Sequence, residues 1–256
     1  MNDAVLYEKR GAVVIVTLNR PEKRNALSAA LRQGIRESLE RFEHDDSASV
    51  AVLTGSGDKA FCAGMDLKEA ADVGLKIPPR GSSGIPVIGV DIELTKPTIA
   101  AVNGAAIAGG WLIAQMCDLC VAAEHAVFAI TEAKVGRGTP WASPLIHMLP
   151  QRVMMEALLT GEPISAQRLY ELGYINKVVP RTELLGEAVS LAERIAANAP
   201  LTVRACRELV RLTTEMGRSA ALRAADQLFA PVYLSEDAQE GPRAFVEKRR
   251  PLWKGR

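Results

Sequence analysis

The sequence predicts an α/β protein, with a parallel-sheet core followed by a helical C-terminal third. Up to about residue 180, short β-branched runs alternate with segments of helical periodicity, which is typical of βαβ units with right-handed crossovers. Beyond it, helical periodicity continues without a credible strand over 184–197, 201–212 and 220–228. The 256 residues are 48% hydrophobic but only 5% aromatic, so we expect a core built mainly from Ala, Val, Leu and Ile.

The first predicted elements are a strand and a capped helix. The run AVVIVTL at 12–18 is rich in β-branched residues and closes at an Asn-Arg-Pro turn, so it predicts a strand. Ser28 is a suitable N-cap for a helix, because apolar residues recur after it at helical spacing, at Leu31, Ile35, Leu39 and Phe42.

Three further strands and a short helix complete the predicted core. Strands are expected at 50–54, 97–102 and 119–123, and Gly109-Gly110 opens a helix that runs toward Met116. Between the first two of these strands, the stretch 72–89 is dense in Pro, Gly and Ser. It therefore predicts a mobile loop rather than a domain linker.

Charge and hydropathy argue against several classes of partner. Lys and Arg number 31 and Asp and Glu 30, so the net charge of +1 gives no global field that would attract a nucleic acid. The one membrane candidate, 99–116, carries Asn103, Gln115 and three glycines, which favours a buried strand–loop–helix. With no apolar signal segment at the N-terminus, we expect a cytoplasmic protein, or one of an organelle matrix after processing.

Motifs for metals, dinucleotides and nucleophilic catalysis are weak or missing. Cys117 and Cys120 form a lone CxxC in a segment that predicts a buried strand, so we interpret them as core thiols. GSGDKA at 55–60 matches GxGxxA, but the acidic residue expected about 20 positions later is missing. The chain lacks a P-loop, an HExxH and a GxSxG, and its three histidines are scattered. We therefore expect no metal and no resident cofactor.

Two glycine-bearing turns follow predicted strands. The first is AFCAGMDL at 60–67, and the second is NGAAIAGG at 103–110. Open α/β sheets bind ligands at this end of their strands, and a glycine pair at a helix start leaves backbone N–H groups uncovered for an anion. Alternatively, these glycines only permit close packing of an Ala-rich helix. From the residues alone, both interpretations stay open.

The order and spacing of these pieces resemble the crotonase superfamily, the enoyl-CoA hydratase/isomerase proteins. The resemblance spans about residues 12–250 and rests on NRP and NAL at 19–27, AFCAGMDL at 60–67, KPTIAAVNGAAIAGG at 96–110, MCD at 116–118 and FVEK at 245–248. It implies a crotonase-like ββα spiral core over 1–190, with the CoA and acyl site. It also implies a C-terminal helical region over 191–256, which would cap CoA and hold a homotrimer, or a hexamer of two trimers, together.

The resemblance further implies which residues carry the chemistry. The backbone amides of Met65 and Gly109 would form an oxyanion hole for a thioester enolate, and Glu132 would act as acid or base. A typical hydratase has a first glutamate twenty positions earlier, where this chain has Leu112. Family members with only the later glutamate include enoyl-CoA isomerases and some hydratase-lyases.

Contacts with the CoA ester are also implied by the resemblance. Coenzyme A enters as part of an acyl-CoA substrate, and no other cofactor is expected. Trp141 is expected to fill part of the acyl pocket, to which Leu112 also belongs. The remaining expected contacts are Arg24, Ala26, Ala63, Asp66 and Leu67 and, sometimes across a subunit interface, Phe245 and Lys248.

The leading hypothesis is therefore an enzyme that stabilises an acyl-CoA enolate and moves protons with Glu132. Hydration, double-bond migration and C–C cleavage all stay open, as does the acyl chain. The alternative is a non-catalytic acyl-CoA-binding or scaffold protein that has lost its chemistry with Leu112 in place of the first glutamate. Retention of Glu132 beside the glycine turns argues against that alternative, and the net charge of +1 gives RNA binding little support.

Overall fold

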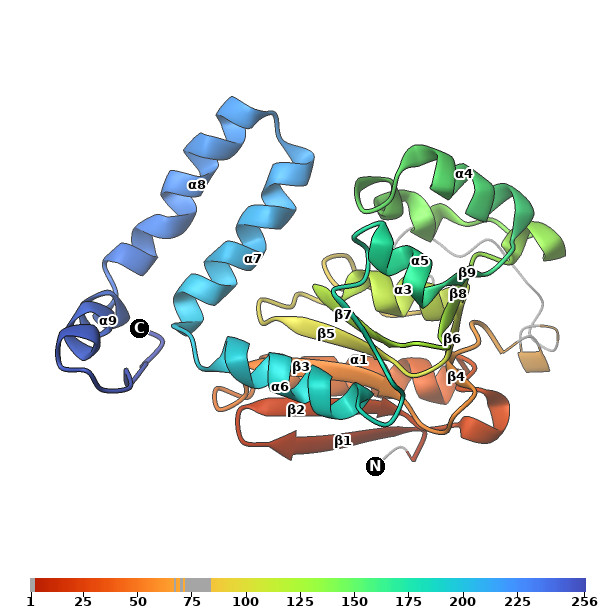
Figure 1. Ribbon diagram of the computed structural model, residues 1–256, viewed down its shortest axis with the longest axis horizontal. Coiled ribbons are helices and arrows are strands. Elements are labelled where there is room, and N and C mark those ends of the chain that lie inside the picture. The colour runs from red at the N-terminus through yellow and green to blue at the C-terminus, as the bar shows by residue number, and fades with distance from the viewer. Residues whose placement is uncertain (1–2, 67, 70, 72–83) are drawn as a thin grey trace.

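The larger of two sheets forms the centre of the molecule (Figure 1). A computed structural model describes residues 3–66, 68–69, 71 and 84–256. Six strands of the described chain form this sheet in the order β1-β2-β3-β5-β7-β10. Strands β2, β3, β5, β7 and β10 run parallel, and β1 is antiparallel to β2. The bounds are β1 Val5–Arg10, β2 Val13–Leu18, β3 Val50–Gly55, β5 Thr98–Val102, β7 Leu119–Ala123 and β10 Lys177–Val179.

A second, smaller sheet lies beside the first. Its four strands have the order β4-β6-β8-β9, with bounds β4 Ala60–Cys62, β6 Ala105–Ile107, β8 Val127–Ala129 and β9 Ile164–Ser165. Three of its strands directly follow a strand of the large sheet, since β4 follows β3, β6 follows β5 and β8 follows β7. The chain therefore winds through both sheets as repeated strand pairs. Gly104 allows one of these steps, because a Cβ there would lie 2.7 Å from the Lys59 carbonyl oxygen.

The predicted strands and the capped helix are confirmed. Helix α1 (Ala29–Glu43) begins at Ser28, whose hydroxyl accepts the Leu31 N–H at 3.3 Å, and its apolar face packs on β1 and β2. The other elements of the core are α3 Gly109–Met116, α4 Gln151–Thr160 and α5 Ala166–Glu171, with 3₁₀ helices η1 Pro21–Lys23, η2 Glu132–Val135 and η3 Pro140–His147.

The C-terminal third is helical, as predicted. Helix α6 (Leu184–Ala196) packs on β3, β5 and β7 of the large sheet. Helices α7 (Pro200–Glu215) and α8 (Arg218–Tyr233) then form a hairpin that projects from the sheets (Figure 1). The last helix, α9 (Glu236–Val246), follows α8. Residue 190 lies inside α6, so the division into 1–190 and 191–256 cuts a helix that covers the sheet. That division stays a prediction.

Several local expectations have a structural outcome. The membrane candidate 99–116 divides into β5, β6 and α3, and no described helix is long and apolar enough to cross a bilayer. GSGDKA leads into strand β4 and not into the helix that a dinucleotide site requires. Cys117 and Cys120 are buried, and burial raises the pKa of both thiols, which agrees with their interpretation as core residues. Of the loop expected at 72–89, residues 72–83 lie outside the described chain.

Candidate active site

The two glycine turns meet in the fold. Gly64 has φ +85°, and a Cβ there would lie 2.8 Å from the Ile107 carbonyl oxygen and 3.4 Å from the Gly109 nitrogen. A Cβ on Gly110 would overlap the Cys62 carbonyl. The turn after β4 therefore packs directly on the first residues of α3, and side chains at these positions would force them apart.

The amides of Met65 and Gly109 lie in these turns. Gly109 is the first residue of α3, where an N–H has no acceptor within its own helix. The N-cap, Ala108, has φ +52° and ψ −116°, a strained conformation for alanine that occurs where the surrounding structure imposes it. The Gly64 carbonyl accepts the Leu27 N–H at 2.8 Å, so the Met65 N–H, on the same trans peptide, points away from Leu27. Neither amide donates a hydrogen bond within the described part of the chain.

Glu132 is a half-buried residue at the first position of η2, shortly after β8. Its Oε1 accepts a hydrogen bond from the Trp141 indole Nε1 at 2.8 Å. Its Oε2 is buried and has no hydrogen-bond partner among the described residues. Burial raises the pKa of Glu132, and the hydrogen bond from Trp141 lowers it in part. A buried oxygen without a partner is costly to the fold, which makes this carboxyl a candidate for chemistry.

Leu112 and Gln115 lie on α3, the helix that begins at the second glycine turn. Leu112 is 2% exposed and offers no polar atom. Gln115 is also buried, and its Nε2 donates to the Trp141 carbonyl oxygen at 2.6 Å. The helix that begins at Gly109 is thus tied to the segment that holds Glu132. The sequence showed Gln115 only as a polar residue in an apolar stretch, and nothing in its spacing predicts this contact.

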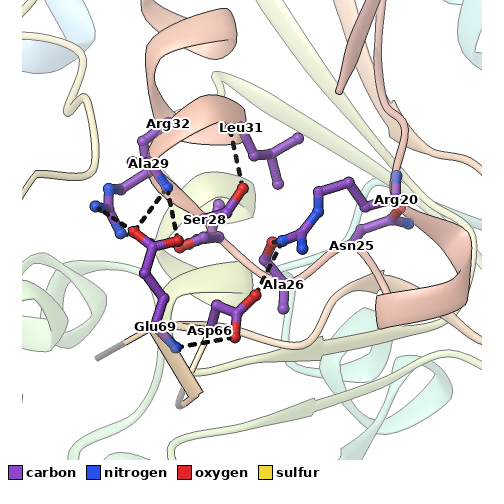
Figure 2. A network of polar contacts seen from close by, with 10 residues as sticks. Arg20, Asn25, Ala26, Ser28, Ala29, Leu31, Arg32, Asp66 and Glu69 are labelled. Carbon is purple, nitrogen blue, oxygen red and sulfur yellow. Dashed lines mark hydrogen bonds and ion pairs between the residues drawn. The ribbon is translucent and has the colours of Figure 1, made fainter. Parts of the chain in front are cut away.

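The residues expected to contact CoA near the N-terminus lie alongside the first glycine turn, and Figure 2 shows two of them, Ala26 and Asp66. The Ala63 N–H donates to the Arg24 carbonyl at 3.0 Å, which aligns 24–27 with 63–66. Arg20 donates through one guanidinium nitrogen to the Ala26 carbonyl at 2.8 Å and to Asp66 Oδ2 at 3.1 Å. Its guanidinium lowers the pKa of Asp66. The fold thus brings Arg24, Ala26, Ala63 and Asp66 together, while Leu67 lies outside the described residues.

A second set of polar contacts involves Glu69. The Glu69 carboxylate accepts the Ala29 N–H at 3.0 and 3.1 Å, at the N-terminus of α1, and pairs with Arg32 at 3.4 Å (Figure 2). A carboxylate is stabilised there by the unpaired amides of the first helical turn. Sequence reasoning missed Arg20, Arg32 and Glu69, because these contacts join residues that are far apart along the chain.

Two expected CoA contacts are not near these turns in the single chain. Phe245 lies in the last turn of α9 and is 85% exposed, and Lys248 lies just beyond the helix on the surface with φ +52°. In Figure 1, α9 lies at the far end of the helical hairpin from β4 and β6. A role for Phe245 and Lys248 at a neighbouring subunit's site stays a prediction.

Comparisons with known proteins agree along nearly the whole chain. The model of the enoyl-CoA hydratase/isomerase family matches residues 8–256. Enoyl-CoA hydratase EchA19 of Mycobacterium tuberculosis is 42% identical over 98% of this chain and 96% of that protein. Carnitinyl-CoA dehydratase of Proteus mirabilis is 38% identical over 100% of both chains. The crystal structure of an enoyl-CoA hydratase from M. tuberculosis H37Rv is similar with a TM-score of 0.92 and 38% identity, covering 99% of this chain and 100% of that one.

Proposed function

Because this chain belongs to the enoyl-CoA hydratase/isomerase family and has the crotonase fold, we propose that it is an acyl-CoA enzyme with one catalytic carboxylate, Glu132. The observation that carries the proposal is the state of that side chain. Its Oε1 accepts a hydrogen bond from Trp141, and its Oε2 is buried and has no partner in the described chain. Such an oxygen is suited to take a proton from a substrate carbon and to return it.

The backbone amides of Met65 and Gly109 would receive the thioester oxygen. Both lie in turns that glycines hold in contact, and neither donates a hydrogen bond within the described residues. Fixed amides stabilise the negative charge that develops on this oxygen as the enolate forms. One such donor contributes about 3 kcal/mol to transition-state stabilisation.

The proposed step is a proton transfer through the enolate. Glu132 Oε2 takes a proton from the α-carbon of a 3-enoyl or 3-hydroxyacyl ester. The C–H electron pair forms the carbon–carbon double bond of the enolate, and the π pair of the carbonyl moves onto the thioester oxygen. Return of the same proton to a different carbon completes a double-bond migration. Alternatively, Glu132 gives this proton to the β-hydroxyl oxygen as the C3–O bond breaks. Water then leaves, the electron pair of the enolate forms the C2–C3 double bond, and the reverse sequence is hydration.

Two observations favour different outcomes of that step. The relatives named above are a hydratase and a dehydratase by name, which favours addition or removal of water. Leu112, however, which stands where a typical hydratase has its first glutamate, has no polar atom that could hold a water. We therefore expect proton transfer on the carbon chain to be efficient and hydration to be slow relative to a two-carboxylate enzyme.

A panel of CoA esters tests the proposal. The native protein is incubated with 2-enoyl-, 3-enoyl- and 3-hydroxyacyl-CoA esters of several chain lengths, and the products are separated by mass and double-bond position. Glu132→Gln is expected to lower turnover by about 10² to 10⁴. Turnover unaffected by Glu132→Gln would show that another group is the base. Tight CoA-ester binding with no turnover of any ester would instead support the non-catalytic alternative.

A further inference from the structure

Trp141 divides the two oxygens of Glu132 into one that is held and one that is not. Its indole Nε1 donates to Oε1 at 2.8 Å, while Oε2 is buried without a partner in the described chain. We propose that Trp141 is a positioning residue that confines proton transfer to Oε2. This inference rests on the proposed function, in which Glu132 is the base. The sequence predicted that Trp141 contacts the acyl chain, whereas in this proposal it acts through its hydrogen bond to the Glu132 carboxylate.

The chemistry of the indole favours protonation at Oε2 over Oε1. An indole N–H is a donor only, so it can bond an unprotonated oxygen but cannot accept from a protonated one. A protonated Oε1 is a weaker acceptor, so a proton there would weaken the 2.8 Å hydrogen bond from the indole. Protonation of Oε2 keeps that bond intact. The proton taken from the substrate therefore goes to Oε2, at a fixed position.

The indole is itself held in place from α3. Pro140 precedes Trp141 at the first position of η3, and the Trp141 carbonyl accepts from Gln115 Nε2 at 2.6 Å. Gln115 lies on the helix whose first residue is Gly109. Two hydrogen bonds thus connect the helix of the proposed oxyanion hole to the proposed base. In a site with Leu112 in place of the first glutamate, this connection fixes the remaining carboxylate.

The ionisable groups around Glu132 do not replace this contact. On its own segment, Lys134 is paired with Glu162 at 2.7 Å, and the Arg137 backbone N–H donates to the Glu132 carbonyl oxygen at 2.9 Å. The helix α4, which packs against η2, carries Arg152 and Glu156, η3 carries His147, and α3 carries no ionisable side chain. The raised pKa of Glu132 traces to burial, and no charged side chain is among its causes.

The test compares two tryptophan-to-phenylalanine variants. Trp141→Phe keeps an aromatic ring and removes the indole N–H from Glu132. Trp111→Phe is the matched control, because the Trp111 indole is also buried and hydrogen-bonded, but to the Tyr174 hydroxyl at 2.9 Å. Each protein is measured twice: by the pH dependence of kcat, and by ¹³C NMR titration of the carboxyl of Glu132, assigned with Glu132→Gln.

The expected result has a definite sign. The indole N–H stabilises the carboxylate, so its removal raises the pKa of Glu132, and a base then loses activity at a higher pH. Trp141→Phe is expected to move both the NMR titration and the acidic limb of kcat upward by about one pH unit, with KM little changed. Trp111→Phe is expected to leave both at their native pH.

The two measurements separate the ways of failing. If Trp141→Phe moves neither the titration nor the acidic limb, Trp141 does not position Glu132 and the inference is wrong. If the titration moves but the limb does not, Trp141 holds the carboxyl but Glu132 is not the base, so the proposed function fails and the proton-transfer role fails with it. If the native protein turns over no ester, the same conclusion about function follows, while the titration still decides whether Trp141 holds the carboxyl.

Discussion

Gly64→Ala tests whether the two glycine turns must touch. Gly64 has φ +85°, where a non-glycine residue costs roughly 1–2 kcal/mol. The added Cβ would also lie 2.8 Å from the Ile107 carbonyl oxygen and 3.0 Å from the Ala108 Cβ. Relieving such contacts costs about 1–3 kcal/mol more, because one partner is backbone and cannot rotate away. We expect the free energy of unfolding to fall by roughly 2–5 kcal/mol in total.

The same displacement should affect activity. A shift of the Met65 or Gly109 amide weakens the proposed oxyanion hole, and the loss of one donor lowers kcat by about 10² to 10³. The assay pairs urea unfolding with kcat on the best ester of the panel. Gly173→Ala is the matched control, because Gly173 has φ +82° but a Cβ there meets nothing within 4 Å. For Gly173→Ala, we expect the free energy of unfolding to fall only by the backbone term of roughly 1–2 kcal/mol, and kcat to stay unchanged.

One result would refute this reasoning. If Gly64→Ala loses no more stability than Gly173→Ala and keeps native kcat, close approach of the turn to α3 is not required. The oxyanion hole would then not depend on the geometry of these glycines.

Two further predictions concern Glu132 and Leu112. Burial raises the pKa of Glu132, so the protonated form stabilises the fold below the ordinary pKa, and this stabilisation is lost as pH rises through the raised folded pKa. The urea midpoint of Glu132→Gln is therefore expected to lie above that of the native protein at pH 7, and the difference is expected to vanish near about pH 4. An equal difference between the two midpoints at both pH values would contradict this. Leu112→Glu places a carboxyl at a position that is 2% exposed and should cost about 3 kcal/mol of stability. It is expected to raise hydration of a short trans-2-enoyl-CoA relative to double-bond migration, whereas Leu112→Gln, which has no carboxylate, should not.

Apolar runs predicted the centre of the fold because burial requires them. Strands β2, β3 and β5 are buried along nearly their whole length, and each is a β-branched or small apolar run in the sequence. Helix α1 was predicted from its cap and its apolar spacing, both of which are local signals. The order and spacing of the glycine turns, together with the other short motifs, indicated the family. These features depend on residues within a few positions of one another, so the chain alone determines them.

Elements without a strong local pattern needed the structure. β1 is exposed on most of its residues and pairs only along one edge, so its mixed composition gave no strand signal. β4, β6 and β8 have three residues each, too few for a period to show. Helix α9 was missed because Pro242 lies inside it.

Only the tertiary structure decided the polar contacts of the site. Resemblance singled out Glu132 and Trp141 separately, but no spacing predicts that the indole of one holds one oxygen of the other across two 3₁₀ segments. The contacts of Glu69 with the start of α1 and of Gln115 with Trp141 join residues 40 and 26 positions apart. Sequence determines which groups are available and which segments are apolar. Which donor meets which acceptor depends on how those segments pack, because a hydrogen bond is set by distances of a few ångströms between atoms that the chain itself keeps far apart.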